Sequence, residues 1–116
     1  LLVGGDYNII PDDRDVWDPE NLVSRTHVTK KERDSLAALE RWGLVDVFRE
    51  FYEDDGLFSW WDYRDGAFHK KMGLRIDLLM ASQPLLKRAN FCLVDRTARK
   101  GKKPSDHAPV FVDVDH

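Results

Sequence analysis

The 116-residue sequence has one cysteine, five prolines, seven glycines and no long apolar run. The single Cys92 excludes an internal disulfide, and no group of Cys and His has zinc-finger spacing, so we expect a reducing, cytoplasmic setting. No apolar segment approaches the roughly 20 residues that cross a bilayer, so we expect no membrane partner. The low Gly and Pro content, with 42% hydrophobic residues, excludes the fibrous and disordered classes and favours a globular fold.

An initiator methionine is also missing, and the sequence begins inside an apolar run at residues 1–3. Such a run is typical of a buried strand, here cut at its beginning. The length allows one compact domain or a part of one. We therefore expect residues 1–116 to be one piece of a larger domain.

The two halves of the sequence carry opposite charge. Residues 1–55 have 7 Lys and Arg against 14 Asp and Glu, whereas residues 56–116 have 11 against 7. Two basic clusters, at residues 69–75 and 96–103, produce the change of sign. They could face phosphate groups or be ordinary solvated loops, and composition leaves both interpretations open.

Hydrophobic periodicity predicts one helix and several strands. Thr29 and Glu32 form a capping-box pattern, and apolar residues then recur at positions 36, 39 and 42, which predicts a helix over residues 29–42. Strands are predicted at residues 1–3, 57–63, 74–81, 90–95 and 110–114. This order indicates an α/β unit with mostly antiparallel pairing.

Polar residues that suit phosphate chemistry lie at the ends of the predicted strands. Asp6 and Asn8 follow the first strand, and Asp77 lies within a later one. Asp106 and His107 directly precede the last strand. Each alone fits an Asx turn, an arginine-paired carboxylate or a structural histidine. Together they could serve phosphoryl transfer, since a carboxylate can orient water, an amide can hold phosphate and an oriented imidazole can donate to it.

Three short segments resemble, in order and spacing, motifs of the exonuclease–endonuclease–phosphatase superfamily: GDYN at 5–8, RID at 75–77 and SDHAPV at 105–110. Longer segments resemble the bacterial exonuclease III family of abasic-site endonucleases and 3′ exonucleases: GDYNIIPDDRDVWDP at 5–19, FSWWDYR at 58–64 and GLRIDLLMAS at 73–82. The resemblance extends from residue 1 to about residue 114.

This resemblance implies an α/β fold, the four-layer α-β-β-α sandwich of deoxyribonuclease I-like proteins. Residues 1–116 would be roughly its C-terminal half, with one mixed, mostly antiparallel sheet and helices. The family's principal metal-binding Glu, a neighbouring Asn and an active-site Tyr come from the other half. The resemblance therefore implies a DNA-repair nuclease of the bacterial cytoplasm, whose C-terminal half is inactive alone.

The resemblance also implies a role for each polar residue. Asp6 would orient or deprotonate the attacking water, and Asn8 would hydrogen-bond the scissile phosphate. His107 would contact a non-bridging phosphate oxygen, with Asp77 fixing its tautomer and charge. Asp106 would lie beside the metal, Mg²⁺ or Mn²⁺.

The implied substrate is double-stranded DNA with abasic sites or 3′ ends. An apolar pocket would receive the flipped sugar, and the first basic cluster would contact phosphates. The substrate-binding residues would then be Trp60, Leu74 and Ile76 in the pocket, and Lys70, Lys71 and Arg75 in the cluster.

Two other hypotheses stay open. A phosphoesterase of the same superfamily could act on a phospholipid or inositol phosphate, although FSWWDYR followed by GLRID favours DNA. Alternatively, a half-domain could bind nucleic acid or form a homodimer without catalysis, because removing half of a sandwich exposes an apolar sheet face. That face is predicted to include Val3, Ile76, Leu78, Val110 and Val112.

Overall fold

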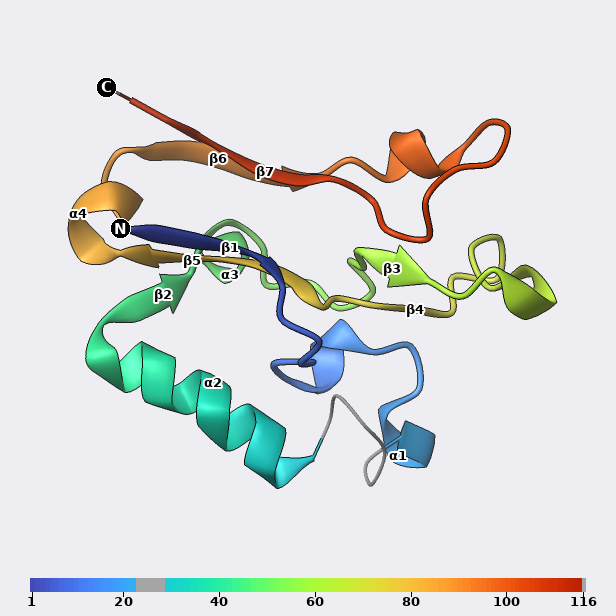
Figure 1. The fold of residues 1–116 in the computed structure, drawn as a ribbon, viewed down its shortest axis with the longest axis horizontal. Helices are drawn as coiled ribbons and strands as arrows, with labels where there is room; N and C mark the ends of the chain where they lie inside the picture. The colour runs from blue at the N-terminus through green and yellow to red at the C-terminus, as the bar shows by residue number, and fades with distance from the viewer. Residues whose placement is uncertain (23–28, 116) are drawn as a thin grey trace.

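The computed structural model describes residues 1–22 and 29–115, and Figure 1 shows their arrangement. The strands are β1 (Leu2–Asp6), β2 (Leu44–Asp46), β3 (Trp60–Trp61), β4 (Gly73–Leu74), β5 (Asp77–Ser82), β6 (Ala89–Val94) and β7 (Val110–Val114). The α-helices are α1 (Pro19–Leu22), α2 (Lys30–Trp42), α3 (Val47–Phe51) and α4 (Gln83–Leu86). Short 3₁₀ helices cover Asp13–Asp15, Arg64–Gly66 and Arg96–Arg99.

The described strands form three small sheets, in the orders β1-β5-β2, β3-β4 and β6-β7. Every ladder among them is antiparallel, so the expected α/β class and antiparallel pairing are confirmed, but the single mixed sheet is wrong. The predicted strand at 74–81 is interrupted at Arg75 and Ile76. There the Arg75 N–H donates to the Asp15 carbonyl and the Ile76 carbonyl accepts from Tyr7, so two sheets replace one.

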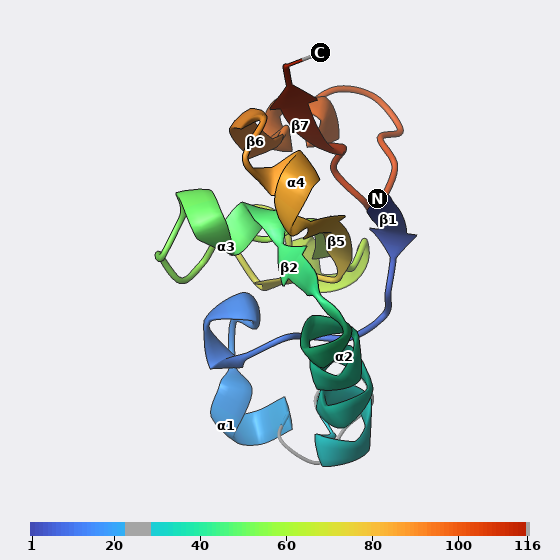
Figure 2. The same cartoon turned by 90° about the vertical axis from the view of Figure 1, so that its left-hand side faces the viewer.

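The layers are seen in both orientations of the ribbon. The β6-β7 pair lies on one side of the β1-β5-β2 sheet, and α2 lies on the other (Figures 1 and 2). Leu36 of α2 packs on β2 and β5 through Leu44, Leu78 and Met80, all of which are buried. The α3 helix contributes Phe48 to a second buried cluster that includes Cys92 of β6. These contacts hold β5 in the middle of the molecule.

Helix α2 occupies the predicted residues because both of its ends are specified locally. The Thr29 Oγ accepts a hydrogen bond from the Glu32 N–H at 3.3 Å and donates one to the Glu32 carboxylate at 2.7 Å. At the other end Gly43 takes a φ of 119°, which a glycine adopts without a steric penalty, and its N–H caps the helix. Trp42, which shares the predicted apolar spacing, is 71% exposed.

Two expectations about burial are wrong. The strand at residues 1–3 is exposed within this chain and not buried, with Leu2 at 42% and Val3 at 41%, although Val3 thereby agrees with the exposed sheet face predicted for it. Conversely, Ile76 and Leu78 are buried within this chain, against the Trp60 cluster and α2 respectively. Among the described residues, no helix is long and apolar enough to cross a membrane.

Candidate active site

Two carboxylates face each other across the first ladder. In the antiparallel register of β1 and β5, Asp6 is paired with Asp77, at the end of one strand and the beginning of the other. The Tyr7 N–H donates to the Ile76 carbonyl at 2.9 Å, which continues the pairing beyond the strand ends. The structure therefore places Asp6 and Asp77 side by side at one end of the β1-β5 ladder.

The turn that carries His107 is attached to β3. The Trp61 N–H donates to the Asp106 carbonyl at 3.1 Å, and Trp60 forms an isolated antiparallel bridge with His107. Within the turn, the His107 N–H donates to the Ser105 Oγ at 3.1 Å. These bonds bring residues near the end of the chain to the edge of the β1-β5 pair.

The imidazole of His107 lies among three carboxylates, which together form the carboxylate–histidine cluster (Asp6, Asp77, Asp106 and His107). The His107 Nδ1 is 2.8 and 3.1 Å from the two carboxylate oxygens of Asp77. On the opposite side of the ring, Nε2 is 3.8 Å from an Asp6 oxygen and 3.9 Å from an Asp106 oxygen. The structure thus brings together four residues that the sequence separates by up to about a hundred positions.

The net effect of this surrounding is to raise the pKa of His107 above its ordinary value. Partial burial alone lowers the pKa, since it disfavours the charged ring. The hydrogen bond and charge of Asp77, followed by the charges of Asp106 and Asp6, raise it by more. With Nδ1–H donated to Asp77, the ring presents Nε2 to the exposed side of the site.

Asn8 follows β1 with a φ of 56°, and its main-chain N–H donates to the Asp6 Oδ1 at 3.0 Å. This is the Asx turn that the pattern of Asp6 and Asn8 allowed. The same hydrogen bond orients the Asp6 carboxylate, and Asn8 lies only two residues after this member of the cluster. A contact between Asn8 and phosphate stays a prediction.

The three residues predicted to line an apolar pocket lie together. Leu74 and Ile76 are buried in one cluster with Ile10 and Val16, and the half-buried Trp60 packs against it. The Trp60 Nε1–H donates to the Asp106 carboxylate at 3.0 Å, so this aromatic ring borders the carboxylate–histidine cluster. A role for these side chains in binding a sugar stays a prediction.

The assignment of Arg75 to an exposed basic cluster is wrong. Arg75 is 1% exposed, and its guanidinium bonds to the carboxylates of Asp15 and Asp46 at 2.7 and 2.5 Å. Burial opposes its charge, but the hydrogen bonds and charges of these carboxylates raise its pKa. An arginine so enclosed is not free for a phosphate. Arg99 of the second basic cluster is also buried, at 6% exposure.

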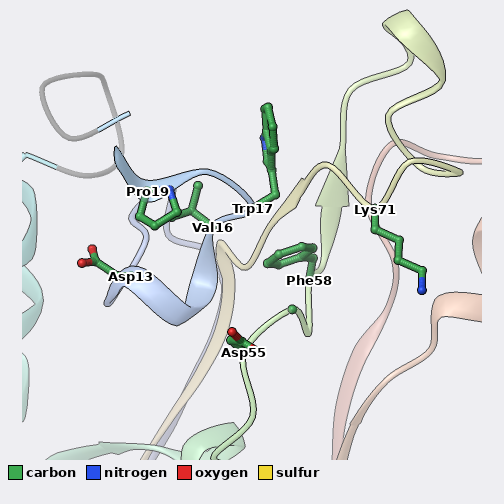
Figure 3. A pocket seen from close by; sticks show the side chains of 8 residues that line it. Asp13, Val16, Trp17, Pro19, Asp55, Phe58 and Lys71 are labelled. Atoms are coloured by element: carbon green, nitrogen blue, oxygen red, sulfur yellow. The ribbon is translucent and has the colours of Figure 1, made fainter. Parts of the chain in front are cut away.

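Lys70 and Lys71 are exposed on the loop before β4, as expected for residues that contact phosphates. Lys71 also lines a cavity of about 310 Å³ with Asp13, Trp17, Asp55 and Phe58 (Figure 3). The described lining of this cavity excludes the carboxylate–histidine cluster. The contact of Lys70 and Lys71 with DNA stays a prediction.

The cluster has the donor set of a divalent-cation site. One ligand atom each from Asp6, Asp77 and His107 lie within 4.8 Å of one another. The Asp6 and Asp106 side chains are 43% and 38% exposed, so their oxygens are open to water and to an ion. Carboxylate oxygens with remaining water positions are what Mg²⁺ and Mn²⁺ prefer. The residues present therefore fit the implied metal.

Two features of the site were not predicted. Ser59, within the predicted strand at 57–63 and directly before β3, is fully buried, and its Oγ accepts a hydrogen bond from the Asp77 N–H. A small polar residue within an aromatic run is a sign of such a buried bond, since a buried hydroxyl needs a partner. Asp15 and Asp46, which hold Arg75, gave no local signal, because they come from other parts of the sequence.

Comparison with known proteins agrees with this geometry. The model of the Endonuclease/Exonuclease/phosphatase family matches residues 1–107. Exodeoxyribonuclease III of Haemophilus influenzae is 36% identical over 97% of this chain and 45% of its own length. An exodeoxyribonuclease of Bacillus subtilis is 31% identical over 95% of this chain and 42% of its own length.

Solved structures show the same fold. The 3′ phosphatase NExo from Neisseria, bound to a product DNA hairpin, superposes with a TM-score of 0.97 and 35% identity over all of this chain. An AP endonuclease from Archaeoglobus fulgidus superposes with a TM-score of 0.91 and 32% identity over 99% of it. This chain covers 45% of each of those two chains, so it spans about half the length of the proteins it matches. The expected deoxyribonuclease I-like α/β fold is confirmed, and the chain belongs to the endonuclease/exonuclease/phosphatase family.

Proposed function

We propose that residues 1–116 form the C-terminal half of an exonuclease III-like enzyme, which hydrolyses phosphodiester bonds in DNA during repair. The observation that carries this proposal is the carboxylate–histidine cluster, in which Asp77 binds Nδ1 of His107 and Asp6 lies beside Nε2. This arrangement leaves one ring nitrogen and one exposed carboxylate facing the same space. A phosphodiester and an attacking water need those two groups.

Asp6, His107 and Asn8 each have a distinct task in the proposed reaction. Asp6, half-exposed at the end of β1, orients the attacking water and accepts its proton. His107, whose pKa is raised mainly by Asp77, donates in its charged form from Nε2 to a non-bridging oxygen of the phosphate. Asn8, in the turn after Asp6, hydrogen-bonds the same phosphate.

A divalent cation, Mg²⁺ or Mn²⁺, would be held by Asp106, as the family resemblance implies, with the exposed Asp6 as a further carboxylate near it, since both lie within 4 Å of His107 Nε2. When bound it neutralises phosphate charge and stabilises the leaving oxygen. The hydrogen bond from the Trp60 indole Nε1–H to the Asp106 carboxylate holds the Asp106 side chain beside the apolar residues around Trp60. Asp106 thereby keeps one oxygen for the ion while the other accepts from the indole.

DNA with abasic sites or 3′ ends is the proposed substrate. Support comes from relatives named exodeoxyribonuclease and AP endonuclease, and from the superposed 3′ phosphatase that holds a DNA hairpin. The exposed Lys70 and Lys71 on the loop before β4 supply positive charge for the DNA backbone. The half-buried Trp60 supplies an apolar wall for a sugar without a base.

The complete protein that contains this chain tests the proposal. It is expected to cleave an abasic duplex with Mg²⁺ or Mn²⁺, and excess EDTA is expected to abolish cleavage. Asp6→Asn and His107→Ala should each lower kcat about 10²- to 10⁴-fold, the range for acid–base and electrostatic groups. Cleavage that survives EDTA, or a loss below about fivefold in either variant, would contradict it. Hydrolysis of inositol phosphates or phospholipids in place of DNA would instead support another branch of the family.

A further inference from the structure

The main-chain N–H groups of Ile76 and Asp77 share one acceptor. Both donate to the Oγ of Ser59, each at 3.1 Å. They lie where the chain leaves β4 and begins β5, so the regular ladder changes partner at this point. The Ser59 hydroxyl therefore fixes the backbone of Asp77 at the only break between these two strands.

The main chain of Ser59 extends the same connection to the turn that carries His107. The Ser59 N–H donates to the Leu74 carbonyl at 2.9 Å, and the Ser59 carbonyl accepts from the Ala108 N–H at 2.8 Å. Ser59 thus joins the segment before Asp77 to the residue after His107. One residue spans both sides of the Asp77–His107 bond.

Water cannot take over the role of this hydroxyl, because Ser59 is 0% exposed. Without the Oγ, the N–H groups of Ile76 and Asp77 must find another acceptor, and the Asp77 backbone would move to reach one. The Asp77 side chain contacts Nδ1 of His107 at 2.8 Å, so a small backbone shift changes that bond. Rate losses of about a hundredfold follow misplacements near one ångström in active sites.

We propose that Ser59 is a positioning residue, which sets the Asp77 carboxylate against His107 through its hydroxyl. Its catalytic consequence rests on the proposed nuclease function, whereas its structural consequence does not. Ser59 itself touches no reacting atom and acts through Asp77.

The test compares Ser59→Ala with Val47→Ala in the complete protein. Val47 is also buried but lies in the hydrophobic cluster with Phe48 and Cys92, so its variant controls for lost stability. For Ser59→Ala we expect kcat for an abasic duplex to fall about 10- to 100-fold with KM changed less than about threefold. In an Asp77→Ala background the same change should cost less than about twofold, because the two residues act as one unit.

A second readout is independent of activity. The Nδ1–H proton of His107, seen by NMR through its bond to Asp77, should be lost or shifted in Ser59→Ala and unchanged in Val47→Ala. If the wild-type protein does not cleave DNA, the proposed function fails, and this signal alone decides the role of Ser59. If Ser59→Ala does not fold, Ser59→Cys keeps the shape with a weaker acceptor and is judged by the same readouts.

Three results would overturn the proposal. The first is a Ser59→Ala protein in which both kcat and the Nδ1–H signal of His107 are unchanged. The second is a loss of kcat in Val47→Ala equal to that in Ser59→Ala at matched stability. The third is a loss of kcat on adding Ser59→Ala to Asp77→Ala that is as large as the loss in the wild-type background. Rescue of kcat in Ser59→Cys above that of Ser59→Ala would support it.

Discussion

His107 has two faces with different partners. Its Nδ1 side is bound to Asp77, whose side chain is 18% exposed, while its Nε2 side looks toward the more exposed Asp6 and Asp106. The less exposed carboxylate, Asp77, therefore orients the imidazole ring. The more exposed carboxylates of Asp6 and Asp106 remain available to an ion or to water. This difference in burial separates the positioning carboxylate from those that could meet a substrate.

The charge of the His107 ring should depend on Asp77. In the complete protein, Asp77→Asn should lower the pKa of His107, because it removes the negative charge of Asp77, which raises that pKa directly and strengthens the hydrogen bond to Nδ1. In the wild type, the stabilisation from the charged pair is fully present below the pKa of histidine in the unfolded chain. It is lost as pH rises through the higher pKa of the folded state.

NMR titration of His107 and denaturant unfolding at about pH 5 and pH 8 measure both effects. The stability difference between wild type and Asp77→Asn should be larger at the lower pH. A His107 pKa that is equal in both proteins, or a stability difference that grows with pH, would contradict this assignment.

The break between β4 and β5 is the element on which the site depends. At Arg75 the main chain leaves β4 to bond with Asp15, and the side chain passes into a buried group with Asp15 and Asp46. Arg49 also pairs with Asp15 from α3. The result is an anchor directly beside Ile76 and Asp77, in which two arginines and two carboxylates pair with one another and Asp15 also accepts from the Asp12 N–H.

Arg75 should therefore act on stability. Arg75→Met leaves the partly buried Asp46 without this arginine and leaves Asp15 with Arg49 as its remaining arginine partner, and should cost up to about 3–5 kcal/mol of unfolding free energy. Lys71→Met, which removes an exposed charge from the loop before β4, should cost less than about 0.5 kcal/mol. Denaturant unfolding of the two variants in the complete protein checks the contrast, and equal stabilities would refute it.

The loop before β4 should act on DNA affinity. Neutralising Lys70 and Lys71 together should weaken binding to duplex DNA and flatten its dependence on salt, by up to about one unit of slope per lost phosphate contact. Folding stability should hardly change, since both side chains are exposed. Binding measured by fluorescence anisotropy over a salt series decides it, and an unchanged slope would make these lysines ordinary solvated residues.

At the scale of the molecule, this chain leaves apolar side chains on its surface. They lie on the edge strand β1 and on the β6-β7 pair: Leu2, Val3, Phe91, Leu93 and Phe111, each about 40–46% exposed. Phe91 and Phe111 stack edge to face across the β6-β7 ladder with their ring centroids 6.0 Å apart. Soluble monomers rarely leave such patches uncovered over more than a few hundred Å².

Residues 1–116 expressed alone should therefore self-associate, as a homodimer or larger species, and should show no metal-dependent cleavage of an abasic duplex. Light scattering at about 0.1 mM, in the range where exposed apolar faces associate, measures the first point. Replacing Phe91 and Phe111 by Ser should reduce the association if the β6-β7 surface is responsible. A stable monomer, or robust cleavage by the isolated chain, would contradict the respective half of this prediction.

Local features determined the elements that could be predicted from the sequence. Helix α2 needs only the Thr29 cap, its apolar spacing and the Gly43 stop, all within fifteen residues, and it forms where predicted. The last strand, predicted at 110–114, is likewise β7. The candidate residues Asp6, Asp77, Asp106 and His107 were named from their places at strand ends and from the family resemblance, and the structure brings their side chains together, while their roles stay predictions.

Tertiary structure decided what depends on distant partners. Arg75 belongs to a basic run in the sequence, yet it is buried because Asp15, 60 positions away, and Asp46, 29 positions away, neutralise it. The same dependence split the predicted strand at 74–81 into two sheets and gave Ser59 its hydrogen bonds to Ile76 and Asp77. Periodicity records which face of a local element is apolar, whereas a buried charge or hydroxyl is stable only where the fold brings its partner.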